Sequence, residues 1–373
     1  MKTSTDRILT THVGSIARPK ELAALLDAQK EGKVDQAEFD RVVCESVRRV
    51  VEEQARAGIS IINDGEQSKP SFSTYVRQRF SGFAAEESVP MPISLDEREY
   101  PNWGYTHRKL APCVAPIAWQ DFSAVEKDIA NLKDAVRGVT YEEVFMTSVS
   151  PGTVANFFPN RFYKTRSDYM AALAEAMSRE YKAIVDAGFI VQVDCPDLAL
   201  RNFWFPDHTI PEFRDVIADN VQVLNESLSG IPKDKVRLHI CWGASETPKS
   251  HDVPLRAIVD IVLKANVGAI SFVGANGAHE HEYKVWTEVD LPDDLILIPG
   301  VVDNTTNIIE HPDWVAERIV RYANIVGRAR VIAGLDCGFG TGSSIRPHVD
   351  PLIAIAKLKA LSEGAQRASQ ELW

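Results

Sequence analysis

The stretch VRLHICWG, residues 236–243, is typical of a β-strand that ends on a histidine and a cysteine two positions apart. Because successive side chains of a strand point to opposite faces, His239 and Cys241 share one face. Two explanations fit a strand that turns an imidazole and a thiol the same way. One is a packed barrel interior, and the other is a pair of ligands for one metal ion.

Seven further runs of this kind are spread along the 373 residues, with amphipathic segments between them. The eight predicted strands lie near residues 7–15, 59–66, 144–152, 189–197, 236–243, 269–275, 295–303 and 330–338. The segment 168–188, DYMAALAEAMSREYKAIVDAG, has the apolar spacing of a helix and a closing glycine. Strands that alternate with helices predict a parallel α/β sheet, and eight such units predict a single (β/α)8 TIM barrel. An open doubly wound sheet is the structural alternative.

One irregular region interrupts this pattern between the second and third predicted strands. Residues 86–116 are rich in proline, aromatic and charged residues, whereas no repeat or clear linker divides the rest of the chain. We therefore expect residues 1–373 to form one domain, with residues 84–118 as an insertion. A long loop in a compact domain usually covers a site or docks a neighbour. The insertion is expected to act as a lid, and its Trp103 and Trp119 are candidates for a homodimer contact.

The composition narrows the class of protein. The chain is 45% hydrophobic and 25% charged, as in soluble globular proteins, and its net charge of -11 argues against a nucleic-acid partner. We find no apolar run long enough for a membrane span and no secretory leader, so a cytoplasmic location is expected. Five scattered cysteines do not make a disulfide framework and are better explained as buried thiols, metal ligands or nucleophiles.

In a TIM barrel the active site lies at the carboxyl ends of the strands, which directs attention to the residues where each run stops. These are His12, Gly14, Ser15, Asp64, Glu66, Asp194, His239, Cys241, Val273, Asp303 and Cys337. One nitrogen and two sulfur ligands favour zinc, and three protein ligands with an open position describe a catalytic site. A coordinated thiol is deprotonated at neutral pH and is then a nucleophile positioned for alkylation.

The alternative for the same residues is purely structural, because isolated cysteines are often buried spacers. Glu66 and Asp194 have a similar alternative, as solvated or salt-bridged carboxylates at strand ends. We expect Cys44, in an amphipathic helix, Cys113, in the irregular region, and Cys195 to be structural.

Seven motifs in order resemble the catalytic barrel of cobalamin-independent methionine synthase, and most closely its short single-barrel relatives. They are TTHVGS, DGEQ, VQVDCPDLAL, LHICWG, HEHEYKVW, IPGVVD and DCGFGTG, and they span about residues 7–342. The resemblance implies a zinc enzyme that moves a methyl group from a folate to the thiol of homocysteine. Short relatives include proteins with other methyl donors and the transferase that adds coenzyme M to epoxides.

Carried over by position, the resemblance implies roles for six residues. His239, Cys241 and Cys337 match three of the four zinc ligands of the family. Glu66 and Asp194 match the carboxylates that hold the amino group of homocysteine, and Ser15, in HVGS beside His12, matches the stretch that meets its carboxylate. An amino acid substrate needs such acceptors and donors, because charge-assisted hydrogen bonds serve both of its charged groups.

The fourth ligand of the family is a glutamate after the sixth strand, where this chain has Val273. We expect three protein ligands plus water or substrate to hold the zinc, which is chemically adequate. A substitute ligand among His279, Glu280 and His281, or a weakened site with a changed function, remains as an alternative.

The methyl donor is open. The full-length folate enzymes have a tryptophan after the third strand and a histidine after the seventh, where this chain has VSPGTVANFF and VVDNTTN. Phe157 or Phe158 could stack a ring, although core packing is the commoner role, and residues 304–306 contain no general acid. Folate is therefore doubtful as the donor.

Taken together, the sequence predicts zinc-dependent alkyl transfer to a small thiol, with methyl transfer to homocysteine as the default. One alternative is the same chemistry on another thiol or electrophile, such as an epoxide. Others are a barrel that binds a small molecule without catalysis, which Val273 motivates, and a zinc-free lyase or decarboxylase like the uroporphyrinogen decarboxylase barrel.

Overall fold

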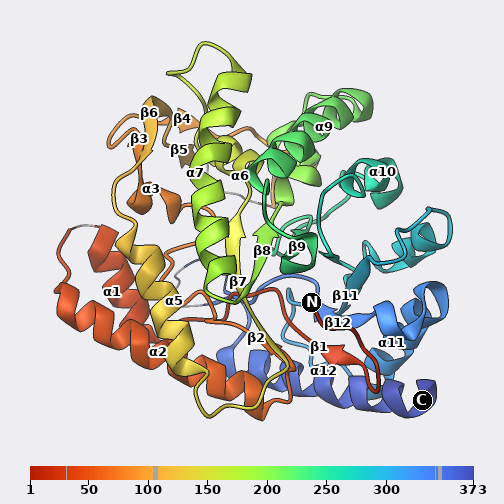
Figure 1. Ribbon diagram of the computed structural model, residues 1–373. Helices are drawn as coiled ribbons and strands as arrows, with labels where there is room; N and C mark the ends of the chain where they lie inside the picture. Colours follow the sequence, from red (N-terminus) through yellow and green to blue (C-terminus); the bar gives the residue numbers. More distant parts are fainter. Residues whose placement is uncertain (31, 104–107, 341, 343–346) are drawn as a thin grey trace.

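Eight parallel strands close into a barrel at the centre of the molecule (Figure 1). The computed structural model describes residues 1–30, 32–103, 108–340, 342 and 347–373. The strands are β1 (Leu9–Thr10), β2 (Ile61–Ile62), β7 (Glu143–Val149), β8 (Ile190–Asp194), β9 (Val236–Ile240), β10 (Ala269–Phe272), β11 (Ile296–Val302) and β12 (Ile332–Leu335). They follow the order β1-β12-β11-β10-β9-β8-β7-β2, and a parallel bridge between Thr11 and Ile61 joins the two ends. The predicted TIM barrel and all eight predicted strands are confirmed.

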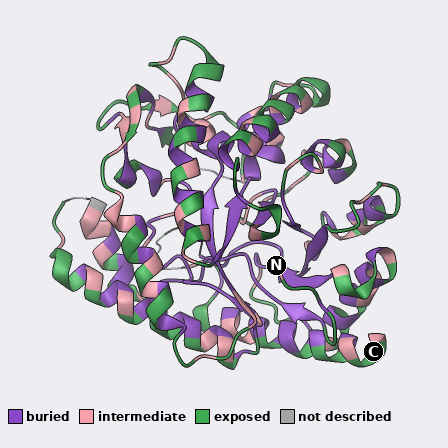
Figure 2. Cartoon of the chain, viewed as in Figure 1, coloured by how far each residue is buried: buried purple, intermediate pink, exposed green. Residues whose placement is uncertain are grey.

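Helices surround this barrel, and Figure 2 shows the buried strands inside a ring of helices whose outer faces are exposed. The main ones are α1 (Lys20–Lys30), α2 (Gln36–Arg56), α5 (Ser123–Ala135), α6 (Pro151–Phe157), α7 (Arg166–Asp186), α8 (Arg201–Trp204), α9 (Ile210–Ser227), α10 (Val259–Val262), α11 (Pro312–Val326) and α12 (Pro351–Leu372). Short 3-10 turns add η1 (Pro196–Leu198), η2 (Lys233–Lys235), η3 (Leu255–Ala257), η4 (Glu280–Thr287) and η5 (Arg328–Arg330). No helix in these described ranges is long and apolar enough to cross a membrane.

Local sequence explains the helix boundaries. Helix α7 is the one predicted from segment 168–188: the Thr165 side chain caps its first turn by accepting from Asp168 N, and Gly188 follows it at φ +95°. A glycine just past the end of a helix adopts this left-handed backbone without steric cost. A side-chain cap also begins α12, where the Asp350 side chain accepts from Leu352 N.

The barrel interior is apolar at the bottom and polar at the top. A small buried cluster fills the lower end: Leu9, Ile61, Phe145, Ile190, Ala269, Ile296, Ile298 and Ile332. Above it lies the guanidinium of Arg237, 3.5 Å from the centre of the Phe145 ring and fully buried. It donates to Gln192 Oε1 (2.7 Å), Thr11 Oγ1 (3.0 Å) and the carbonyl of His12 (2.8 Å). These bonds satisfy a charge that would otherwise be costly to bury.

The insertion is more ordered than the irregular loop that its composition predicts. The segment between β2 and β7, which includes the predicted insertion, contains α3 (Val76–Arg79), β3 (Phe80–Phe83), β4 (Val89–Pro90), α4 (Leu95–Glu99), β5 (Lys109–Leu110) and β6 (Cys113–Trp119). Two antiparallel pairs, β3 with β6 and β4 with β5, gather at one edge of the molecule (Figure 1). Proline is tolerated in β6 because a two-stranded pair leaves one edge of each strand unpaired.

The insertion is fastened to the loops at the barrel mouth through Asp96. The Asp96 carboxylate accepts from Ser250 Oγ (2.8 Å), Asn202 Nδ2 (2.9 Å) and Lys249 N (3.1 Å). In return, Asn202 Oδ1 accepts from the backbone of Leu95 at 2.8 Å. Asp96 is only 2% exposed, so these bonds are shielded from water.

Trp119, one of the two candidates for a homodimer contact, packs against the helical layer of its own chain. It is half-buried, its ring lies 4.5 Å from that of Phe80, and its Nε1 donates to the carbonyl of Ala176 in α7. The residue anchors the insertion to the helical layer.

Candidate metal centre and substrate cavity

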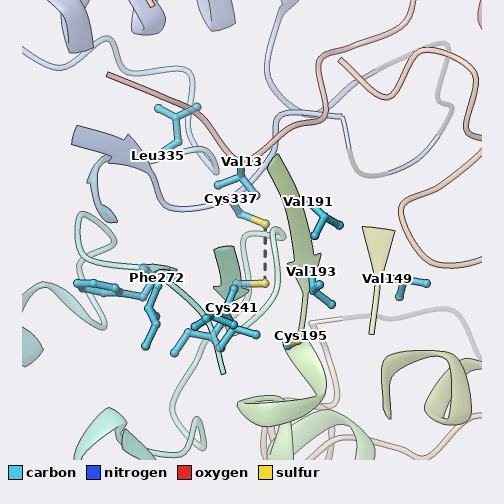
Figure 3. Close-up of a cluster of buried hydrophobic side chains, with 14 of the residues drawn as sticks. Val13, Val149, Val191, Val193, Cys195, Cys241, Phe272, Leu335 and Cys337 are labelled. Carbon is cyan, nitrogen blue, oxygen red and sulfur yellow. Dashed lines mark hydrogen bonds between the residues drawn. The ribbon is translucent and has the colours of Figure 1, made fainter. Parts of the chain in front are cut away.

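Three ligand-type side chains converge at the top of the barrel. His239 lies in β9, Cys241 follows that strand, and Cys337 follows β12. Their ligand atoms all lie within 4.8 Å of one another, and all three residues are buried. Figure 3 shows the two sulfur atoms pointing toward each other, with Val13 and Val193 nearby. The sulfurs lie 3.8 Å apart. The structure thus brings together the three residues that the sequence predicts as metal ligands.

The two nitrogens of His239 have different surroundings. Nδ1 lies 3.1 Å from Ser271 Oγ on the neighbouring strand β10. Nε2 is buried and has no hydrogen-bond partner among the described residues. A metal-binding histidine is usually oriented in this way, with one nitrogen held by a second residue and the other left for the ion.

The two sulfurs are hydrogen-bonded to each other. The Cys337 thiol donates to Cys241 Sγ, and this bond together with nearby His239 holds the pKa of Cys241 well below its ordinary value. The same bond, with burial, raises the pKa of Cys337. A lowered thiol pKa favours the deprotonated sulfur that a divalent ion requires. The set of donors, one nitrogen and two sulfurs, fits zinc.

The side chains near Val273 do not offer a fourth ligand. Val273 is buried directly after β10. Both ring nitrogens of His279 are engaged, Nδ1 with Glu282 (2.9 Å) and Nε2 with Asp252 (3.1 Å). Glu280 is paired with Arg318 and His281 is exposed. The alternative in which one of these replaces the missing glutamate is therefore disfavoured by their contacts.

A cavity of about 170 Å³ opens beside the three ligands, and Ser15, Glu66 and Asp194 line it. Glu66 follows β2 at φ +54°, a left-handed backbone that is uncommon outside glycine. Its Oε1 accepts from Thr147 Oγ1 at 3.0 Å, whereas Oε2 is buried without a hydrogen-bond partner in the described ranges. Strained, under-satisfied groups of this kind concentrate at binding sites.

Two residues that the sequence did not single out support Asp194: Gln192 contacts its carboxylate, and Arg237 contacts Gln192. Gln192 Nε2 donates to Asp194 Oδ1 (2.8 Å), and Gln192 Oε1 accepts from Arg237. Burial raises the pKa of Asp194 to about 7, an effect that Glu66 increases and His239 opposes. Gln192 and Arg237 precede Asp194 and His239 by two positions, so strand alternation alone indicates that they point inward.

Ser15 lines the cavity, whereas His12 lies behind its wall. Ser15 Oγ accepts from Gly340 N at 3.3 Å, and a Cβ at Gly338 would overlap this hydroxyl. His12 does not line the cavity in the described structure. It is buried in the wall, with Nε2 2.7 Å from Gln54 Oε1, and burial lowers its pKa to about 4. Ser15 is thus placed to contact a ligand, whereas His12 is placed to support the wall.

The outer part of the cavity has an aromatic wall, defined here as Phe72, Phe157, Phe203 and Trp204. The Phe157 ring lies 4.8 Å from that of Trp204 and 6.0 Å from that of Phe72, with steep angles between the planes. Of these four, the sequence predicted a possible ring contact for Phe157 alone, because only Phe157 lies in the stretch after the third predicted strand where the full-length folate enzymes have a tryptophan. Phe158, the other candidate in that stretch, stacks on Phe83 in the core at 4.0 Å.

Fold and site together define a class: a TIM-barrel enzyme with a buried His-Cys-Cys centre beside a small cavity that carboxylates and aromatic rings line. A family model described as "Cobalamin-independent synthase, Catalytic domain" matches residues 8–357, and the chain belongs to this family. The resemblance inferred from the motifs is confirmed. The protein is a methyltransferase-like enzyme.

Relatives and solved structures agree with this assignment. The chain is 25% identical to a methionine synthase of Sulfolobus acidocaldarius, over 97% of this chain and 93% of that protein. It is 23% identical to a methionine synthase of Saccharolobus solfataricus, over 97% and 95%. A B12-independent methionine synthase from Shewanella, solved with selenomethionine, has the same fold, with a TM-score of 0.77, 20% identity and coverage of 98% and 99%.

Proposed function

We propose that this protein is a zinc enzyme that transfers a methyl group to the thiol of homocysteine and so forms methionine. One observation carries the proposal: an imidazole nitrogen and two sulfurs converge beside a cavity that contains Glu66 Oε2, which has no hydrogen-bond partner in the described structure and lies 3.9 Å from Arg18 Nη2. The first set suits a metal and the second suits an ammonium group. A thiol-bearing amino acid is a substrate that uses both.

His239, Cys241 and Cys337 would hold the zinc, with Ser271 orienting the imidazole. When bound, zinc supplies a Lewis acid that keeps a coordinated thiol deprotonated at neutral pH. Three protein ligands leave a position open, so Val273 is compatible with catalysis.

Glu66 and Asp194 would orient the substrate through its ammonium group. Both carboxylates line the cavity, and an ammonium between them would offset the repulsion that raises the pKa of Asp194. Gln192 fixes one oxygen of Asp194 before the substrate arrives, which lowers the cost of ordering the site. Ser15 would contribute its hydroxyl to the substrate carboxylate.

The insertion would act as a lid. Ser94, Asp96 and Trp103 from this segment line the cavity, and the Asp96 contacts hold the segment over the mouth. A closed mouth keeps a reactive thiolate away from bulk water and oxidants.

The decisive experiment compares cysteine variants by metal content and by product. We expect Cys241→Ser and Cys337→Ser to lose bound zinc and methionine formation while the circular dichroism spectrum stays that of the wild type. Cys44→Ser, a change of the same chemistry in α2 away from the cavity, should retain both. Wild-type protein purified without chelator that holds no zinc, or variants that keep full activity, would contradict the proposal.

A thiol panel tests the substrate. Homocysteine should be methylated, and a thiol that carries a sulfonate in place of an amino acid group should not, because Glu66 and Asp194 repel a second anion. Turnover with the sulfonated thiol alone would favour the coenzyme M type of chemistry instead.

A further inference from the structure

We propose that the methyl donor is a methyl-onium compound, a sulfonium or quaternary ammonium whose charged centre sits against the aromatic wall. This inference rests on the proposed function, because it names the second substrate of the same cavity. Three observations carry it: the composition of the wall, the lack of an acid left for the donor among the described lining residues, and the surplus of carboxylates around the cavity.

The aromatic wall suits a cation without hydrogen-bond donors. Phe72, Phe157, Phe203 and Trp204 all line the outer cavity, and consecutive rings meet at interplanar angles between 69° and 86°. The rings of the wall therefore do not lie in one plane, and all four side chains border the cavity. Ring faces attract onium centres, and proteins recognise quaternary ammonium ligands with clusters of aromatic side chains.

Among the described residues that line the cavity, no general acid is left for the donor, because the proposed function assigns Glu66 and Asp194 to the ammonium group of homocysteine. His239 is the only imidazole among the described lining residues, and it belongs to the metal centre. The carboxylate of Asp96 accepts three hydrogen bonds, and that of Asp252 is held by His279 and Lys249. The loop after β11 places Asn304 in a hydrogen bond to the carbonyl of Gly338, at 3.2 Å.

The lack of an acid for the donor limits which atom can give up its methyl group. A neutral tertiary amine that gives up its methyl group would depart as an amide anion unless an acid protonates it. An onium donor needs no acid. The thiolate sulfur forms a bond to the methyl carbon, the bond from that carbon to the onium centre breaks, and its electron pair stays on the departing atom. The products are a neutral thioether and a neutral sulfide or amine, and the only proton released is the one that the thiol lost earlier.

Charge around the cavity favours the same class of donor. Among the described lining residues, the four carboxylates of Glu66, Asp96, Asp194 and Asp252 outnumber the one guanidinium, that of Arg108, and the protein as a whole has a net charge of -11. Such a field concentrates cations at the mouth and repels anions. Trp204 adds a specific contact: it is 7% exposed, and its Nε1 has no hydrogen-bond partner within the described structure. That N–H is available to an acceptor, such as a carboxylate, on the donor molecule.

A donor panel tests the proposal with zinc-loaded enzyme and homocysteine. Each donor carries an isotopic label in its transferable methyl: S-methylmethionine, dimethylsulfoniopropionate, glycine betaine, methyl-tetrahydrofolate and methylcobalamin. We expect labelled methionine from at least one onium donor. If homocysteine binds and only the folate or the cobalamin donor gives product, the inference fails and the proposed function stands. If homocysteine binds and no donor gives product, the inference also fails. If homocysteine does not bind, both fail.

Variants of the aromatic wall provide a second test. Trp204→Leu and Phe157→Leu should each lower kcat/KM for the onium donor about tenfold, the size expected for a lost cation–π contact in a desolvated site. The Kd for homocysteine should not change. Phe162→Leu is the matched control, because Phe162 is 46% exposed and outside the cavity, and it should behave as the wild type. An equal loss of homocysteine affinity in the wall variants would assign them a structural role and overturn the inference.

Discussion

Replacement of Glu66 by glutamine isolates the contact with the substrate ammonium. The amide keeps the size of the side chain and can still accept from Thr147 Oγ1, which lies 3.0 Å from Oε1. It loses the charge on Oε2, the atom that is buried without a hydrogen-bond partner in the described structure. A hydrogen bond to a charged group contributes about 1.5–3 kcal/mol, so the Kd for homocysteine should rise roughly 10- to 150-fold.

A second ligand makes this prediction specific. The analogue 4-mercaptobutanoate has the thiol and the carboxylate of homocysteine but no amino group. Wild-type enzyme and Glu66→Gln should bind it with similar affinity, because the altered contact is absent from that complex. Isothermal titration of both ligands into zinc-loaded protein gives the four affinities of a double-mutant cycle.

The control and the refuting outcome follow from the position of Glu66. Glu52→Gln, the same change on the exposed face of α2, should leave all affinities unchanged. If Glu66→Gln weakens both ligands equally, the residue shapes the cavity and does not bind the ammonium. An unchanged Kd for homocysteine would refute the reasoning outright.

Three further predictions concern residues behind the site. Ser271→Ala removes the partner of His239 Nδ1, and zinc affinity measured by chelator competition should fall 10- to 100-fold. Gln192→Leu frees Asp194, so the KM for homocysteine should rise about tenfold with a smaller change in kcat. His12 has a pKa lowered to about 4 by burial, so the unfolded state binds its proton first as pH falls. Stability should therefore decline from pH 6.5 toward 4, by about 3 kcal/mol from this group, and His12→Gln should flatten that slope in urea denaturation.

The barrel could be predicted from sequence because its signals are local. Each strand is a short β-branched run, and the alternation with amphipathic helices leaves few architectures. Because the active site of a TIM barrel lies at the carboxyl ends of its strands, the sequence also predicted His239, Cys241 and Cys337 as site residues. The insertion was harder, since its strands contain prolines and expose alternate residues. Its seven-residue strand Cys113–Trp119 is stabilised by pairing with Phe80–Phe83, which no local pattern reveals.

The residues that contact the candidate metal ligands and complete the cavity could not be predicted from the sequence either. Ser271 contacts His239 because β9 and β10 are neighbours in a particular register, and Asp96 contacts Ser250 although 154 positions separate them in the chain. Trp204 and Phe72 join one wall although Trp204 ends α8 and Phe72 lies between β2 and α3. Such contacts depend on long-range packing, which single-sequence patterns do not encode.

The order of the ligands along the chain has a consequence for biosynthesis. Two of them belong to the fifth barrel strand and its edge, whereas the third follows the last strand, which pairs with the first to close the ring. A nascent polypeptide therefore leaves the ribosome with an incomplete coordination set until that final strand emerges. Binding of the metal ion therefore requires a complete polypeptide and a closed barrel. Chains that terminate before the last strand should bind the metal weakly and be sensitive to proteases.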